Sequence, residues 1–160
     1  MGRDSGVAGR QRRLVRYALD TSVMLRWFSN ANDVDTELAL RLREEHLYEN
    51  VELQVLDQSI YELMQVLKDN SNFDQTNITS ALDSLEYMHI GVVPYSHELA
   101  RKSAQIAIEH NISINASCFV ALGAHLRCQA ITSDEILYQK VAANPWTLLL
   151  ANLDFLSPHR

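Results

Sequence analysis

Residues 113–135 read SINASCFVALGAHLRCQAITSDE, a segment that joins a helical pattern to a strand pattern. Its first part places small and apolar residues at helical spacing, among them Cys118, Ala121 and Leu122. Its second part, QAIT at 129–132, is an apolar run of strand length. The acids of the segment, Asp134 and Glu135, come directly after that run. The segment therefore predicts a helix, then a buried strand, then a polar strand end.

Four more apolar runs of strand length occur along the chain. They are LVRYAL (14–19), ELQVL (52–56), HIGVV (89–93) and TLLL (147–150). The runs largely lack the alternation of a half-exposed strand, which is typical of strands buried on both faces of a parallel sheet. The intervals hold apolar residues at helical spacing, for example Ile60, Leu63, Met64 and Leu67. This alternation predicts a three-layer α/β/α fold with a central parallel sheet of about five strands and right-handed crossovers.

The composition favours one compact domain. The chain has 160 residues, 47% of them apolar, with three Pro and five Gly. We expect a single domain over residues 14–156, between a flexible basic N-terminal arm at 1–13 and a C-terminal tail at 157–160. The cysteines, Cys118 and Cys128, have apolar neighbours and are expected to be free thiols in a reducing compartment. No apolar run approaches the roughly 18 residues of a membrane helix, so we expect a cytoplasmic protein without a membrane partner.

Charge is distributed unevenly along the chain. The first sixteen residues hold five arginines and one acid, whereas the rest holds nine basic and nineteen acidic residues, a net charge of −10. An acidic body argues against broad, non-specific binding of nucleic acid and suits a site that gathers carboxylates around a divalent cation. The basic arm could contact phosphates, although an unstructured leader is the favoured interpretation.

Acids follow three of the predicted strands. Asp20 comes after the first, Asp57 comes after the second and leads to Glu62, and Asp134 comes after the fourth. In open α/β sheets, ligands bind beyond the carboxyl ends of the strands, where the strand order reverses. Gathered carboxylates repel one another unless a cation compensates them, and hard divalent ions take oxygen ligands. No histidine lies at metal-ligand spacing, so the pattern favours Mg²⁺ or Mn²⁺ over zinc.

Each of these acids also has a purely structural interpretation. Asp20 could be the N-cap of the helix that follows it. Glu62 could complete a capping box with Ser59, and Asp134 could belong to a second capping box at 132–135. The pattern leaves both interpretations open for Asp20 and Asp134, and it favours the capping box for Glu62.

Three motifs occur in a fixed order along the chain. They are YALDTSVMLRWF (17–28), SIYELMQVL (59–67) and NASCFVALGAHLRCQAITSDEIL (115–137). In this order and spacing they resemble the PIN domain family of metal-dependent ribonucleases, in particular the toxins of VapBC-type toxin–antitoxin pairs. The resemblance covers roughly residues 16–153. It implies the strand order 3-2-1-4-5, which would bring Asp20 and Asp134 together where the strand order reverses.

The resemblance also implies the roles of individual residues. The metal ligands and catalytic residues would be Asp20, Glu62 and Asp134. The side chains that position them or contact a ligand would be Thr21, Ser22 and Thr132. In the family, the helix before the fourth strand begins with an acid, and this position is Ala116 in the present chain. Ala116 cannot coordinate a cation, and Asn115 or Ser117 could offer only a neutral oxygen instead. With one negative charge fewer, the affinity for metal should fall.

The function implied by the resemblance is that of a Mg²⁺- or Mn²⁺-dependent single-strand endoribonuclease that hydrolyses phosphodiester bonds. Its partners would be RNA and an antitoxin protein, and it would form a homodimer. The alternative is a catalytically degenerate PIN domain that acts as an RNA-binding or protein-interaction module. An unrelated doubly wound phospho-acceptor or small-molecule domain is disfavoured, because neither G-x-G-x-x-G nor G-x-x-x-x-G-K occurs.

Overall fold

A five-stranded parallel sheet forms the centre of the computed structural model, which describes residues 14–70 and 72–155. The strands are β1 (Val15–Leu19), β2 (Val51–Leu56), β3 (Gly91–Val93), β4 (Gln129–Thr132) and β5 (Thr147–Leu149). Their order is β3-β2-β1-β4-β5, and every neighbouring pair is parallel. The predicted fold class and strand order are therefore confirmed. The predicted arm at 1–13 and tail at 157–160 lie outside the described residues.

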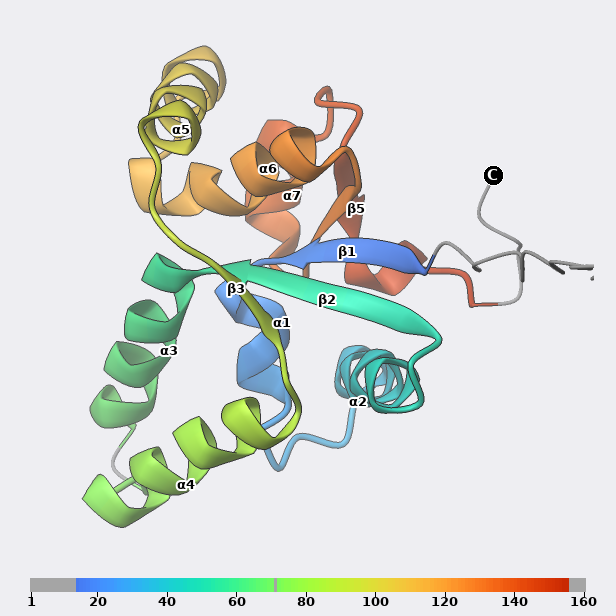
Figure 1. Cartoon of the computed structure of the whole chain (residues 1–160), viewed down its shortest axis with the longest axis vertical. Coiled ribbons are helices and arrows are strands. Elements are labelled where there is room, and N and C mark those ends of the chain that lie inside the picture. The colour runs from blue at the N-terminus through green and yellow to red at the C-terminus, as the bar shows by residue number, and fades with distance from the viewer. Residues whose placement is uncertain (1–13, 71, 156–160) are drawn as a thin grey trace, which may run out of the picture.

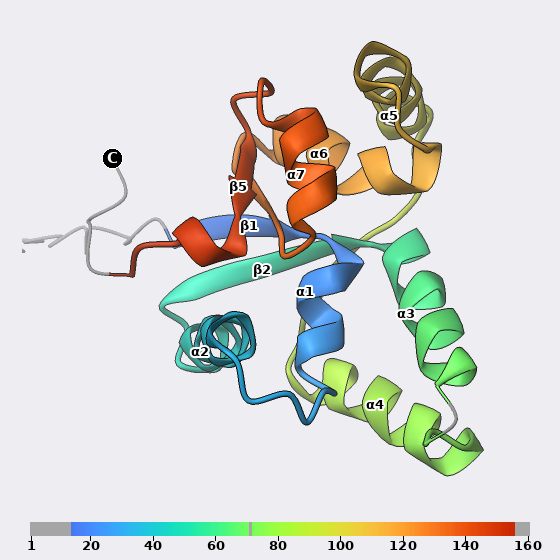
Figure 2. The same ribbon diagram turned by 180° about the vertical axis from the view of Figure 1, so that it is seen from behind.

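Seven α-helices and a short 3-10 helix accompany the sheet in the described part of the chain. They are α1 (Thr21–Arg26), α2 (Val34–Leu47), α3 (Asp57–Asp69), α4 (Gln75–Tyr87), α5 (His97–His110), α6 (Ile114–Leu126), α7 (Glu135–Val141) and η1 (Leu150–Asn152). Helices α5, α6 and α7 lie on one side of the sheet, and α1 to α4 lie on the other (Figures 1 and 2). Among the described residues, no helix combines the length and the apolar character that a bilayer crossing requires.

Alternate residues of the central strands build two separate apolar cores. In β1, Tyr17 and Leu19 join the core under α1 to α4, whereas Ala18 joins the core under α5 to α7. Neighbouring residues of β4 divide in the same way, with Ile131 in the first core and Ala130 in the second. Both faces of these strands are buried, which explains why the sequence showed continuous apolar runs rather than alternation.

The strand at the edge is shorter than its apolar run. The sequence predicted a strand over 89–93, but β3 begins only at Gly91. His89 has a left-handed backbone, with φ of 53°, because it lies in the turn that ends α4. The chain can pair with β2 only after leaving this turn.

Helix α6 packs unusually close to the sheet at Gly123. A Cβ atom at this position would lie 2.8 Å from the Ala130 Cβ and 2.9 Å from the Cys128 carbonyl oxygen. The helix leads directly into β4 and so runs back across the sheet, which places its first turn at the carboxyl ends of the strands. Ala116 lies about two turns before Gly123 and on the same helical face. The missing acid position is therefore on the face of α6 that is turned toward the sheet.

Candidate metal centre

The loops after β1 and β4 lie side by side at the carboxyl edge of the sheet. Leu19 pairs with Ile131, and the Asp20 backbone N–H donates to the Ile131 carbonyl at 2.9 Å. The Asp20 Oδ2 atom accepts two hydrogen bonds, from Ser22 Oγ at 2.7 Å and from Thr132 Oγ1 at 2.8 Å. The two loops are thus joined through one carboxylate, at the point where the strand order reverses.

The Asp20 carboxylate is not used to cap a helix. Asp20 occupies the N-cap position of α1, but its side chain makes no capping hydrogen bond. Burial raises the pKa of Asp20, the hydrogen bonds from Ser22 and Thr132 oppose this rise, and the negative charge of Glu62 adds to it. No ion pair involves Asp20 within residues 14–70 and 72–155. Among the residues that the structure describes, the site therefore holds a carboxylate whose pKa is raised by burial and by a second acid, and no cationic partner for it.

A second set of hydrogen bonds fixes the two loops to one another. The Ser133 backbone N–H donates to Ser22 Oγ at 3.0 Å, and Arg26 Nε donates to Ser133 Oγ at 3.0 Å. Arg26 also pairs with Asp33 at 2.9 Å and with Asp35 at 3.5 Å, so its positive charge is already compensated. Sequence reasoning missed Ser133 and Arg26. Arg26 and Ser133 are 107 residues apart in the chain, and no local pattern connects them.

Glu62 lies on α3, half-buried, with one oxygen already bonded. Its Oε2 atom accepts from Gln58 Nε2 at 2.8 Å. Helix α3 begins at Asp57 rather than after Ser59, so Ser59 is a buried residue inside the helix and not its cap. The capping-box interpretation of Glu62 was therefore wrong. The capping box does not form because β2 continues directly into α3 without an intervening loop, and Leu56 is the N-cap residue.

Asp134 has a different environment from Asp20. It is exposed, it is the N-cap residue of α7, and its Oδ1 atom accepts from the Leu137 backbone N–H at 3.0 Å. Its own backbone N–H donates to Thr132 Oγ1 at 3.1 Å. Asp134 therefore does cap a helix, as the structural interpretation predicted, although the cap residue is Asp134 and not Thr132.

Within the described residues, no group of three or more His, Cys, Asp or Glu residues is arranged to hold a metal ion.

The other predicted site residues, Thr21, Ser117 and Asn115, differ in their hydrogen bonds and in their exposure. Thr21 is buried, and its Oγ1 atom has no hydrogen-bond partner in the described part of the chain. Ser117 Oγ lies within hydrogen-bonding distance of two carbonyl oxygens, those of Ser103 at 2.8 Å and Ile114 at 2.7 Å, which ties α6 to α5. Asn115 is exposed in the first turn of α6.

Asp57 is a third acid at this edge of the sheet, because it follows β2, the parallel neighbour of β1. Burial raises the pKa of the Cys118 thiol, and the negative charges of Glu62, Asp20 and Asp57 raise it further. The negative charges of all three carboxylates therefore act on the pKa of one buried thiol on α6. Asp57 was noted in the sequence as a strand-end acid, but no role was assigned to it.

The donor set suits a hard divalent cation. Asp20 and Glu62 supply carboxylate oxygens, and the Asp20 Oδ2 and Glu62 Oε2 atoms are already oriented by hydrogen bonds from neighbouring side chains. Mg²⁺ in proteins is usually held by one or two carboxylates, with water and phosphate completing its coordination. A cation here would also offset the cost of burying the Asp20 carboxylate. The residues present therefore fit such an ion.

Comparisons with known proteins agree with this geometry. A family model described as PIN domain matches residues 17–143. The chain belongs to the PIN domain family. A search among curated protein sequences gave no significant match.

Solved structures with the same fold include the following three. A toxin–antitoxin complex from Klebsiella pneumoniae has 15% identity and a TM-score of 0.63, over 85% of this chain and 97% of that chain. A protein from Pyrobaculum aerophilum has 16% identity and a TM-score of 0.58, over 85% and 90%. VapBC2 from Rickettsia felis, bound to a DNA fragment from its promoter, has 13% identity and a TM-score of 0.62, over 84% and 97%. At these identities the likeness concerns the fold.

Proposed function

We propose that this PIN domain is a Mg²⁺- or Mn²⁺-dependent single-strand endoribonuclease whose principal cation ligands are Asp20 and Glu62. The observation that carries the proposal is the half-buried Asp20 carboxylate, which lies where the strand order reverses and has no cationic partner among the described residues, and whose pKa is raised by burial and by the charge of Glu62. Perturbed carboxylates at such a position are typical of functional sites. Asp134 is proposed as a further ligand, with Thr21 as a neighbouring hydroxyl.

The residues around Asp20 prepare it for this role. Hydrogen bonds from Ser22 and Thr132 fix the orientation of the carboxylate, as outer partners of metal ligands generally do. Gln58 holds one oxygen of Glu62 in the same way. A bound divalent cation would supply an activated water and stabilise charge on the phosphate oxygens of a phosphodiester. The chain itself contributes the negative charge, the fixed oxygens and the face of α6 that is turned toward the sheet.

The chain departs from the family pattern on this face of α6. An acid at position 116 would lie on the face of α6 turned toward the sheet, but Ala116 contributes neither charge nor oxygen. We therefore expect weak binding of Mn²⁺ and low nuclease activity. The substitution Ala116→Asp should raise the Mn²⁺ affinity by at least about tenfold, since even outer partners of metal ligands contribute that much.

Calorimetric titration with Mn²⁺ and an assay of RNA cleavage test this prediction. Ala116→Asn is the matched control, because it adds a side chain of similar size without the negative charge. A gain with Ala116→Asp and none with Ala116→Asn would support the proposed site. Full activity of the natural chain that is abolished by Asp20→Asn would show that the vacancy at 116 is harmless. If neither the natural chain nor Ala116→Asp binds Mn²⁺, the nuclease assignment fails.

A catalytically degenerate PIN domain is the second candidate. Two observations favour it: Ala116 stands at the position of a family acid, and Asp134 is exposed with one carboxylate oxygen committed to its helix. In that case the fold would serve as an RNA-binding or protein-interaction module. RNA binding without cleavage, in both the natural chain and Ala116→Asp, would support this function over the first.

The partners and the location of the protein form a separate part of the proposal. Two of the structures with this fold are described as a toxin–antitoxin complex and as VapBC2 bound to promoter DNA. By analogy, we propose that this chain is the toxin of such a pair, with an antitoxin protein as its partner, and that it acts in the cytoplasm as a homodimer. A small reading frame directly upstream whose product co-purifies with this chain would support the pairing. Light scattering of the purified chain tests the dimer.

A further inference from the structure

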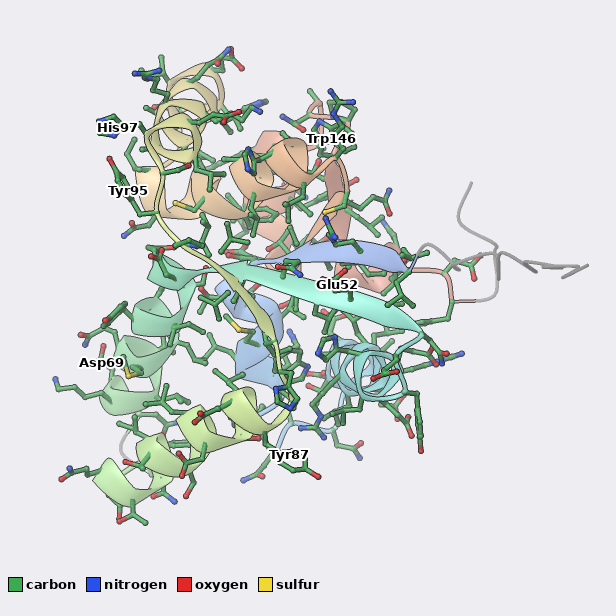
Figure 3. The ribbon with its side chains drawn as sticks, in the orientation of Figure 1. Glu52, Asp69, Tyr87, Tyr95, His97 and Trp146 are labelled. Carbon is green, nitrogen blue, oxygen red and sulfur yellow. The ribbon has the colours of Figure 1, made fainter. Side chains whose placement is uncertain are left out.

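Two exposed rings stand together where β3 leads into α5. Tyr95 is 63% exposed and His97 is also exposed. Their rings are 5.7 Å apart between centroids, at an interplanar angle of 86°, and Tyr95 Oη shares a hydrogen bond with His97 Nδ1. Figure 3 shows the two side chains next to one another at the start of α5. The pair is therefore preformed, with its aromatic surface open to solvent.

The pair is attached to the acid site through Asp57. The Tyr95 backbone N–H donates to Asp57 Oδ2 at 3.1 Å, across 38 residues of sequence. Asp57 is the first residue of α3, the helix that carries Glu62. Asp57 directly follows β2, which lies between β1, the strand before Asp20, and β3, the strand that leads to Tyr95. The aromatic pair thus lies at the same carboxyl edge of the sheet as the proposed metal centre, which is its rim.

Helix α5 adds positive charge beside the rings. Arg101 lies four residues after His97, which places both side chains on one face of the helix, and it is exposed. Within residues 14–70 and 72–155, no ion pair involves Arg101 or its neighbour Lys102. These cations are consequently available to a negatively charged ligand, unlike Arg26, whose charge is compensated.

We propose that Tyr95 and His97 stack an unpaired base of single-stranded RNA at the rim of the acid site, while Arg101 contacts a phosphate of the same strand. Exposed aromatic faces bind bases that are free of a duplex stack, and a nearby cation tracks the backbone. A duplex would keep its bases away from these rings. The inference rests on the proposed function for its substrate class and identifies where the strand enters.

The test measures binding of a short fluorescein-labelled single-stranded RNA to the full chain by fluorescence anisotropy, in EDTA, so that neither cleavage nor metal binding is needed. Tyr95→Ala should raise the Kd by about tenfold, corresponding to the loss of one stacked base. Tyr95→Phe keeps the ring and should stay within about twofold of the natural chain. The matched control is Tyr87→Ala, because Tyr87 is 81% exposed at the end of α4, far from the pair (Figure 3).

Salt dependence separates the two kinds of contact. Arg101→Gln should reduce the slope of log Kd against log salt by about 0.7, the value for one phosphate contact with a single strand. Tyr95→Ala should leave that slope unchanged. Equal binding by Tyr95→Ala and the natural chain, an equal loss with Tyr87→Ala, or preference for duplex RNA would each overturn the inference.

Failure of the inference and failure of the proposed function give different results. Loss of RNA binding in Tyr95→Ala, with no cleavage by the natural chain in Mn²⁺, would refute the nuclease and support the stacking site. Cleavage by the natural chain, with the same KM in Tyr95→Ala, would support the nuclease and overturn the stacking site. A natural chain that does not bind single-stranded RNA at all would also overturn it.

Discussion

The loops after β1 and β4 place an aspartate at the same position and use it in opposite ways. Asp20 and Asp134 are the N-cap residues of α1 and α7. The Asp134 side chain caps its helix and is exposed, whereas the Asp20 side chain makes no capping bond, is desolvated and has a raised pKa. One aspartate stabilises its helix, and the other costs stability when ionised. Functional sites commonly contain a charged group that lowers the stability of the fold, as the ionised Asp20 carboxylate does.

The largest effect should come from Asp20→Asn. An amide can still accept the hydrogen bonds of Ser22 and Thr132, but it carries no charge for a cation. Cleavage of RNA should fall by at least about a hundredfold, since the change removes a direct ligand rather than an outer partner. In EDTA the same substitution should raise the melting temperature, because it removes the desolvated charge, and each kcal/mol corresponds to about 2–4 °C for a chain of this length.

The gain in stability should depend on pH with a defined sign. The pKa of folded Asp20 is raised above the value in the unfolded chain. The natural chain therefore loses stability as pH rises from the unfolded value, about 4, through the raised folded value. Thermal melts in EDTA should show no difference between Asp20→Asn and the natural chain at the acidic end, and a growing difference above it. A difference that is the same at all pH values would mean that ionisation of Asp20 is not its cause.

The sequence was sufficient to predict the strands and the positions of the acids, since both depend on local pattern. Four of the five apolar runs contain their strands, β2 begins one residue before its run, at Val51, and acids follow β1, β2 and β4 as expected. The partner of each hydroxyl was not predictable. Ser22 bonds to Asp20 within its own loop, whereas Thr132 lies 112 residues from Asp20 and its hydroxyl reaches that carboxylate only because β1 and β4 are neighbours. The capping box at Glu62 was wrong for a different reason, since the pattern does not show that β2 continues directly into α3 and places Ser59 inside the helix.

Thr132→Val should have the next largest effect and should act on both loops. Thr132 is fully buried, and its hydroxyl donates to Asp20 and accepts from the Asp134 backbone N–H. The isosteric change leaves that N–H without its partner, which should lower the free energy of unfolding by about 1–3 kcal/mol. It also removes a hydrogen bond that lowers the pKa of Asp20, so the pH dependence described above should move upward.

Thr147→Val is the matched control on the adjacent strand β5. The Thr147 hydroxyl lies near the carbonyl oxygens of Val141 and Asn144 and has no link to the acids. Urea titration should therefore show that both variants lose stability, while Mn²⁺ calorimetry should show weaker binding only for Thr132→Val. Equal Mn²⁺ affinity in the two variants would mean that Thr132 supports the fold without orienting a ligand.

The smallest effect should separate the two interpretations of Asp134. Asp134→Ala removes the cap of α7 and should lower the free energy of unfolding by about 1 kcal/mol. Asp134→Asn keeps a capping oxygen and removes only the charge, so its stability should stay close to that of the natural chain. If Asp134 also binds the cation, Asp134→Asn should weaken Mn²⁺ binding, by less than Asp20→Asn does, because its carboxylate is exposed and shared with Leu137. Unchanged Mn²⁺ affinity in Asp134→Asn would reduce Asp134 to a helix cap and leave Asp20 and Glu62 to hold the ion alone.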